Sequence, residues 1–291
     1  MAEMTIAAVL GLLGAAGGGP GEPAFRAPQA TSDYAAAMRR VATRFAGTPG
    51  VYLQIGDSLT YASSNTAWAR DGLDHTPAEA AFLRWSHAGR RDQRDGWHLA
   101  SVDVADDGVP PGRSHPAASG LRSDELLAGG KAGLSPLAEM LEHYRPQLAL
   151  YLLGTNDLLA GRPAERYVAD VERAAELMLA RGTVPILSTL PPCRGHADRV
   201  DADNTAVRAL ARRLRLPLID LHAEMRARAG EEMERVYLAE DGVHLTHEPA
   251  RGPVTAANLA RCGYLLRCYL AVHKGMEVKA AVLDPNPPGR P

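Results

Sequence analysis

Leu148-Ala149-Leu150-Tyr151-Leu152-Leu153 is an unbroken apolar run that ends at the polar turn Gly154-Thr155-Asn156-Asp157. A short apolar run closed by a turn is typical of a strand that is buried on both faces of a parallel sheet. Strands that alternate with helices predict an α/β fold of three layers, α/β/α, with a central parallel sheet of about five strands. The other predicted strands lie at 51–55, 97–104, 184–190 and 216–221, and the predicted helices lie at 31–45, 123–129, 135–144, 163–181, 201–214 and 255–282. Gly275 could break the last of these helices.

The composition is that of a globular protein. Of 291 residues, 46% are hydrophobic and 23% are charged, which excludes collagen-like, coiled-coil and wholly disordered chains. Cys193, Cys262 and Cys268 form no disulfide framework, and we expect them to be buried thiols. The formal net charge is −2, without a block of like charge, so nucleic acid is not an expected partner. The sequence does not indicate an oligomeric state.

The N-terminal segment 1–30 leaves two interpretations open. Its apolar run at 5–16 is too short to span a bilayer, so stable membrane insertion is not expected. The run is similar to the apolar region of a signal peptide, but Met1-Ala2-Glu3-Met4 before it carries an acid and no Lys or Arg. A signal-like segment predicts export to the periplasm or medium. A disordered tail predicts a cytoplasmic protein.

The rest of the chain is most simply read as one domain over 31–283. Residues 61–118 form a large insertion that we expect over one end of the sheet, and 284–291 form a proline-rich, disordered tail.

Three polar clusters stand where chemistry is expected in such a fold. Asp57-Ser58 and Asn156-Asp157 follow apolar strands, and Asp241-Gly242-Val243-His244 precedes the terminal helix. Ligands of open α/β sheets bind at the carboxyl ends of the strands. Each cluster alone is commonly a turn, but together they hold a hydroxyl, an amide, an imidazole and a carboxylate. That set suits acyl transfer.

The clusters also resemble a known family. Gly56-Asp57-Ser58-Leu59-Thr60 resembles block I of the GDSL, or SGNH, hydrolases. Gly154-Thr155-Asn156-Asp157 resembles block III, and Asp241-Gly242-Val243-His244 resembles block V. Ser119-Gly120 resembles block II less closely, because Ala117-Ala118 stands where an Asn and a Gly usually precede it. The resemblance runs from the first strand to the terminal helix and implies the flavodoxin-like SGNH-hydrolase fold over the single domain.

The resemblance implies a catalytic triad. Ser58 would be the nucleophile and His244 its general base, with Asp241 orienting the imidazole and stabilising its charged form. The rival Gly-x-Ser-x-Gly elbow of other serine hydrolases does not occur in this sequence.

The resemblance also implies an oxyanion hole. Its donors would be the backbone N–H groups of Ser58 and Gly120 and the side-chain amide of Asn156. Asp57 and Asp157 are expected to hold their loops through side-chain to backbone hydrogen bonds rather than to act in catalysis.

No metal or organic cofactor is predicted. His244, His247 and Glu248 are close in sequence, but no His-Glu-x-x-His pattern occurs and zinc sites usually need three suitably spaced ligands. His196 and Asp198 follow a strand and could border the cleft, although a solvated loop is the better interpretation.

The insertion contains all three tryptophans, Trp68, Trp85 and Trp97. Their rings could stack on a sugar or line an acyl pocket. The alternative is a small core of the insertion itself, which we favour for Trp85. Asn65 and Arg70, soon after Ser58, could face the cleft.

The sequence therefore predicts a serine esterase that cleaves carboxylic esters through an acyl-enzyme. Small acyl groups on carbohydrate are the favoured substrates, which would make it a deacetylase, since no long apolar stretch marks a lipid-binding lid. One alternative is an acyltransferase with the same triad, distinguished by exclusion of water from the acyl-enzyme. The other is a catalytically silent carbohydrate-binding domain, which would have no need for the complete catalytic set.

Overall fold

The computed structural model describes residues 31–90, 95–99 and 114–284. The segment 1–30 and all but the first residue of the expected tail 284–291 lie outside the described residues, as does much of the second half of the insertion.

The described strands form one parallel sheet. They are β1 (Tyr52–Gly56), β2 (Leu148–Leu152), β3 (Val184–Ser188) and β4 (Leu218–Ile219), hydrogen-bonded in the order β1-β2-β3-β4. Every residue of these strands is buried, as expected when helices cover both faces. The α/β class and the parallel sheet are thus confirmed. The described residues contain four strands rather than the expected five.

The missing strand is the one predicted at 97–104. Residues 97–99 belong instead to the short helix α5 (Gly96–Leu99), and 100–104 lie outside the described residues. The backbone N–H of Trp97 donates to Asp95 Oδ1 at 3.0 Å, a helix-start contact that the apolar pattern of this stretch obscured. Beside β1, where the fifth strand would lie, the described chain makes a single parallel bridge, between Gly56 and Ala117.

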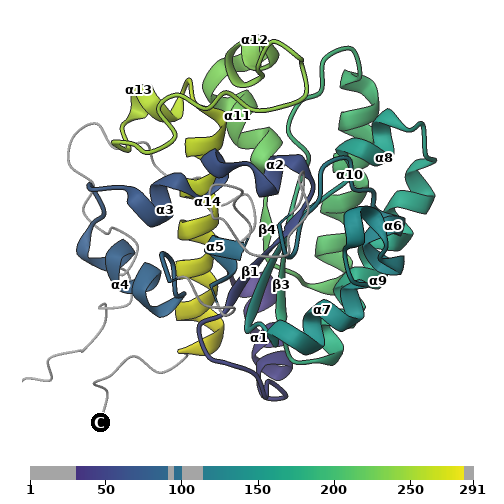
Figure 1. Ribbon diagram of the computed structural model, residues 1–291, viewed down its shortest axis with the longest axis vertical. Coiled ribbons are helices and arrows are strands. Elements are labelled where there is room, and N and C mark those ends of the chain that lie inside the picture. The colour runs from purple at the N-terminus through teal and green to yellow at the C-terminus, as the bar shows by residue number, and fades with distance from the viewer. Residues whose placement is uncertain (1–30, 91–94, 100–113, 285–291) are drawn as a thin grey trace, which may run out of the picture.

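Helices form a layer on each side of the sheet (Figure 1). One layer consists of α1 (Thr31–Ala42) and α14 (Gly263–Val278), with α3 (Ala67–Asp71) and α4 (Pro77–Trp85) packed against α14. The other consists of α6 (Ser123–Ala128), α7 (Leu137–Tyr144), α9 (Ala164–Ala180) and α10 (Ala197–Leu214). The remaining α-helices are α2 (Ser58–Tyr61), α8 (Thr155–Leu159), α11 (Leu221–Ala229), α12 (Met233–Tyr237) and α13 (Ala256–Leu259). Three-residue 3₁₀ turns occupy 63–65, 131–133 and 230–232, and a π turn occupies 279–283.

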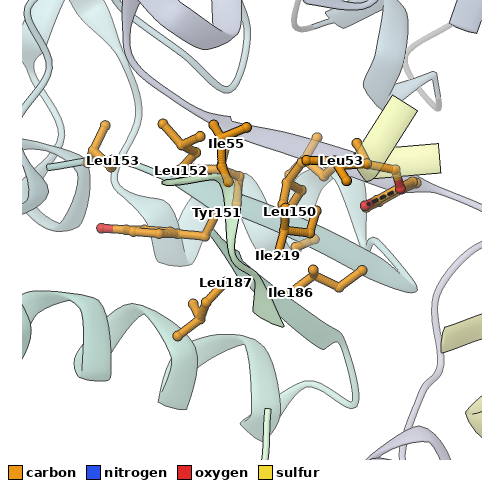
Figure 2. Packing of buried hydrophobic residues seen from close by; sticks show 14 of the residues in the cluster. Leu53, Ile55, Leu150, Tyr151, Leu152, Leu153, Ile186, Leu187 and Ile219 are labelled. Carbon is orange, nitrogen blue, oxygen red and sulfur yellow. Dashed lines mark hydrogen bonds between the residues drawn. The ribbon is translucent and has the colours of Figure 1, made fainter. Parts of the chain in front are cut away.

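The hydrophobic core follows the sheet. Leu53 and Ile55 of β1, Leu150 of β2 and Ile186 of β3 are among its members labelled in Figure 2. Side chains of a strand alternate between its two faces, so each strand contributes to the packing of both helical layers. The three cysteines are buried and unpaired, as expected.

The terminal helix differs from its predicted form. It was expected over 255–282 with a break at Gly275, but the chain is interrupted at 260–262, between α13 and α14. Gly275 lies within the unbroken helix. A Cβ there would come within 2.4 Å of Phe82 Cζ and 3.0 Å of Tyr52 Cε1. The glycine therefore permits close packing of α14 and does not end it.

Candidate active site

The loop that carries Ser58 follows directly from β1. Gly56 ends the strand, Asp57 caps α2, and Ser58 is the first helical residue. Asp57 Oδ1 accepts the backbone N–H of Leu59 at 3.0 Å, an N-cap contact. A Cβ on Gly56 would lie 2.0 Å from Thr60 Oγ1 and 2.5 Å from a β2 carbonyl oxygen. The turn into α2 can therefore be this tight only with glycine at its start.

Arg267 of α14 supports α2 from below. Its guanidinium donates to the carbonyl of Leu59 and, at 2.7 Å, to Thr60 Oγ1, and the side chain is buried. Burial lowers the pKa of Arg267 from its ordinary value. Asn65 adds a hydrogen bond from Nδ2 to the Thr60 carbonyl at 3.0 Å. The helix that begins at Ser58 is thus fixed by a residue about two hundred positions later in the chain.

His244 lies between Ser58 and Asp241. Its Nδ1 is 2.6 Å from Asp241 Oδ2, and its Nε2 is 3.0 Å from Ser58 Oγ. An ionised carboxylate only accepts hydrogen bonds, so Nδ1 carries the proton and Nε2 is left to accept from the serine hydroxyl. Asp241 Oδ1 accepts the backbone N–H groups of Val243 and His244, each at 2.9 Å. The backbone of the 241–244 loop therefore holds the Asp241 carboxylate in the orientation that faces His244.

The two carboxylates of the site have opposite pKa shifts. Partial burial works to raise the pKa of Asp241, but the hydrogen bonds from Val243 and His244 outweigh it and lower the value to about 2. Burial dominates at Asp57 and raises its pKa to about 6, although the Leu59 N–H and the Arg267 charge act against it. Asp241 is thus ionised at all ordinary pH values, whereas Asp57 titrates near pH 6.

Asn156, in the first turn of α8, faces the Ser58 loop. Its Nδ2 donates to Asp57 Oδ2 at 3.0 Å and to the Leu121 carbonyl at 3.2 Å. The reversed amide would set its oxygen against these two acceptors, so the contacts fix which way the amide points.

Gly120 precedes Leu121 and has a φ of +69°, a conformation that favours glycine. A Cβ there would meet only the end of Lys131, at 3.6 Å, so the backbone conformation and not crowding explains the glycine. Among the described residues, no hydrogen bond uses the backbone N–H of Ser58 or Gly120. Both donors are therefore available to a ligand.

Comparison with known protein families matches most of this chain to one of them. The model of the GDSL-like Lipase/Acylhydrolase family matches residues 54–250, a span that contains the Ser58, Gly120, Asn156 and 241–244 clusters. The chain belongs to this family. This acylhydrolase is accordingly a hydrolase of carboxylic esters with an SGNH-type α/β fold.

Solved structures share the fold at low sequence identity. A catalytic mutant of an acetylxylan esterase from Geobacillus stearothermophilus is 14% identical, with a TM-score of 0.50 over 79% of this chain and 96% of that one. A putative acylhydrolase from Bacteroides fragilis is 16% identical (TM-score 0.48, 84% and 98% covered). A carbohydrate esterase family 3 structure from Talaromyces cellulolyticus is 17% identical (0.47, 72% and 93%). No curated protein matches the chain in sequence.

Asp157 of the acylhydrolase holds its loops, as expected. The fully buried carboxylate accepts the Ser123 N–H at 2.9 Å and the Ser123 hydroxyl at 2.6 Å, and it pairs with Arg162. It joins the loop before α6 to α8 and so places Asn156 without touching the reacting groups.

The tryptophans do not form a sugar platform. Trp68 and Trp97 are buried in the main core, which overturns the suggestion that they stack on a ligand. Trp85 is partly buried and packs against Phe82 and Lys279. Trp68 packs against Tyr269 of α14 and Trp97 against Tyr52 of β1, so both indoles belong to the core of the domain.

The remaining residues singled out from the sequence lie outside the triad. His196 and Asp198 are exposed at the start of α10, in agreement with a solvated loop. Within the described ranges, no three His, Cys, Asp or Glu side chains gather as a metal site. In the same part of the acylhydrolase, no helix is long and apolar enough to cross a membrane.

Sequence reasoning missed Arg267. The sequence does contain an indication of its role, because Arg267 is the one charged residue in the apolar stretch from Gly263 to Val272 of the terminal helix. A lone Arg in a buried helix face needs partners for its donors, and here they are the carbonyl and hydroxyl of α2.

Proposed function

We propose that the protein is a serine esterase in which Ser58 attacks the ester, His244 is the general base and Asp241 orients the imidazole. The supporting observation is the unbroken chain of hydrogen bonds from Asp241 through His244 to Ser58, with lengths of 2.6 and 3.0 Å. A serine hydroxyl is a weak nucleophile unless a base within hydrogen-bond reach takes its proton. The resting structure already has that contact.

The reaction divides into two transfers of the acyl group. Ser58 Oγ bonds to the carbonyl carbon while its proton moves to His244 Nε2, and the carbonyl oxygen becomes an oxyanion. When the intermediate collapses, the bond to the alcohol oxygen breaks and His244 returns the proton to that oxygen. Water then attacks the acyl-enzyme in the same way, which releases the acid and restores Ser58.

The oxyanion would be held by the backbone N–H groups of Ser58 and Gly120 and the amide of Asn156. Both amide hydrogens of Asn156 have acceptors at rest, Asp57 and Leu121. The bond to the neutral Leu121 carbonyl is the longer, at 3.2 Å, and a charged oxygen is a stronger acceptor than a carbonyl. We therefore assign the Leu121 bond as the one that the oxyanion replaces, while Asp57 keeps the amide in place.

A small acyl group on a carbohydrate is the proposed substrate. The side chains of Asp241 and His244 are 50% and 42% exposed, so the base works at an open surface that accepts a bulky polar alcohol. The same openness favours hydrolysis over acyl transfer to a second alcohol, because water reaches the base freely. A silent binding domain would not require Ser58, His244 and Asp241 in hydrogen-bonded series.

Labelling with a fluorophosphonate serine probe tests this proposal, with turnover of p-nitrophenyl acetate measured alongside. We expect labelling and turnover in the wild type, and loss of both in Ser58→Ala with an unchanged melting temperature. Folded wild-type protein that is neither labelled nor active, or a Ser58→Ala variant that keeps more than about a tenth of the activity, would contradict it.

A further inference from the structure

A cavity of about 280 Å³ lies between the segments that follow the nucleophile and the base. One wall consists of Ser63, Ser64 and Ala67, in the stretch from α2 to α3. The facing wall is the loop from His247 to Arg251, which leads from His244 to α13. In Figure 1, α2, α3 and α13 lie toward the same end of the molecule. The cavity is therefore on the side of the sheet where the triad stands.

The chain itself limits how far the cavity is from the reacting atoms. His247 is three residues from His244, and three residues reach at most about 11 Å. Ser63 is five residues from Ser58, but the first four residues of that stretch are wound into α2, where each adds only about 1.5 Å. The two segments that line the cavity follow Ser58 and His244 in the chain. Because Ser58 Oγ and His244 Nε2 are only 3.0 Å apart, both segments start next to the candidate active site. The cavity is therefore near enough to the triad for a substrate bound at Ser58 to extend into it.

The lining is suited to hydroxyl groups. Ser63 and Ser64 supply hydroxyls, and the exposed side chains of His247, Glu248 and Arg251 supply an imidazole, a carboxylate and a guanidinium. Arg251 is also 3.4 Å from the carboxylate of Asp71, so the positive charge of the lining is partly balanced. Such a wall both donates and accepts hydrogen bonds without a strong net charge.

The buried end of the cavity is lined by small side chains. Ala67 and Ala250, at 3% and 7% exposure, are the buried members of the lining. The volume is near the lower limit for small-molecule sites, which begin at about 300 Å³. An acyl chain would require a mainly apolar lining, and an anion would require an excess of positive charge. The geometry therefore favours a neutral polyhydroxylated ring.

We propose that this cavity is the subsite for the alcohol part of the substrate, a neutral pyranose ring whose hydroxyls bond to Glu248, Arg251 and the two serines. The inference rests on the proposed esterase function. It assigns the specificity for the leaving group to the 63–67 and 247–251 segments, whereas p-nitrophenyl acetate, which lacks sugar hydroxyls, makes no use of them.

The kinetic test compares two acetates. The probes are p-nitrophenyl acetate and a methyl pyranoside carrying a single O-acetyl group. Glu248→Gln removes a charged acceptor, and Ser64→Leu fills the cavity. For each variant we expect kcat/KM on the sugar ester to fall about tenfold, chiefly through KM, and to change less than about twofold on p-nitrophenyl acetate. The matched control Glu165→Gln, an exposed carboxylate at the start of α9, should change neither.

Equal effects on both acetates, or none on the sugar ester, would overturn the subsite. A second readout does not require activity: saturation-transfer NMR of the unacetylated methyl pyranoside with Ser58→Ala protein, which should give contacts that Ser64→Leu abolishes. If the wild type hydrolyses neither acetate, the esterase proposal fails, and the NMR result still decides whether the cavity takes a sugar. Pyranoside contacts that survive Ser64→Leu would place the sugar elsewhere.

Discussion

The two sides of the active site are built in opposite ways. On the nucleophile's side, Asp57 is 1% exposed, and α2 rests on a buried arginine from the far end of the chain. On the other side, Asp241 and His244 are about half-exposed and bond chiefly within four consecutive residues. The first arrangement depends on the assembled core. The second is held by its own loop and by Arg194, which donates to the carbonyls of Gly242 and Glu240. Mutation of the exposed side chains should therefore separate catalysis from stability, whereas mutation on the buried side should couple them.

The largest expected effect comes from the exposed side. His244→Ala removes the proposed general base, and Asp241→Asn removes the carboxylate proposed to select the tautomer of the imidazole. We expect kcat to fall at least about 10³-fold in each. Because these are surface positions, the free energy of unfolding should change by no more than about 0.5 kcal/mol. Steady-state kinetics and urea unfolding measure the two quantities. A large loss of stability in either variant would mean that this loop is not self-supporting.

Asp57→Asn tests the buried side. An asparagine still caps α2, but its Nδ2 would face the Nδ2 of Asn156, and two donors cannot bond. We expect Asn156 to turn away from the oxyanion and kcat to fall about 10²-fold, with little change in KM. Retention of wild-type kcat would show that Asn156 does not depend on Asp57. Asn156→Ala is the reference for complete loss of this donor.

Arg267→Met should have a smaller effect on kcat, about tenfold, because it removes two donors from beneath α2 while leaving the cap intact. Arg267→Lys, which restores one donor, should recover part of the loss. The rate of fluorophosphonate labelling reports the position of Ser58 directly. If both variants label at the wild-type rate, the cap alone positions the nucleophile.

The last expected effect concerns stability as a function of pH and leaves catalysis aside. Because burial raises the pKa of Asp57 from 3.8 to about 6, the folded protein binds a proton between these values that the unfolded chain releases. The contribution of this group to stability therefore falls as pH rises through that window. Asp57→Asn should gain stability relative to the wild type as pH rises from about 4 to about 6, and the gain should then level off, as measured by urea unfolding at each pH. A constant difference would contradict the raised pKa.

The sequence predicted most of the architecture, because β2 and β3 are buried on both faces and carry an unmixed apolar signal. It failed at residues 97–99, which were predicted to begin a strand but belong to a short helix that starts just after Asp95. It also failed at Gly275, since close packing on Phe82 leaves no trace in local propensity. The polar clusters identified the residues that the structure brings together. Arg267 and the cavity depend on contacts between distant segments, which single-sequence patterns do not encode.

The distance along the chain between the partners of the site also bears on how the enzyme is made. Ser58 meets His244 across 186 positions, and α2 meets Arg267 across about 208. Such non-local contacts form late, because the loop they close is long. During synthesis the segment that carries Ser58 emerges long before the residues that align it, because Arg267 of α14 follows α2 by about two hundred positions. Turnover of an ester should therefore report completed folding, and a nascent chain that lacks α14 should carry Ser58 without hydrolytic activity.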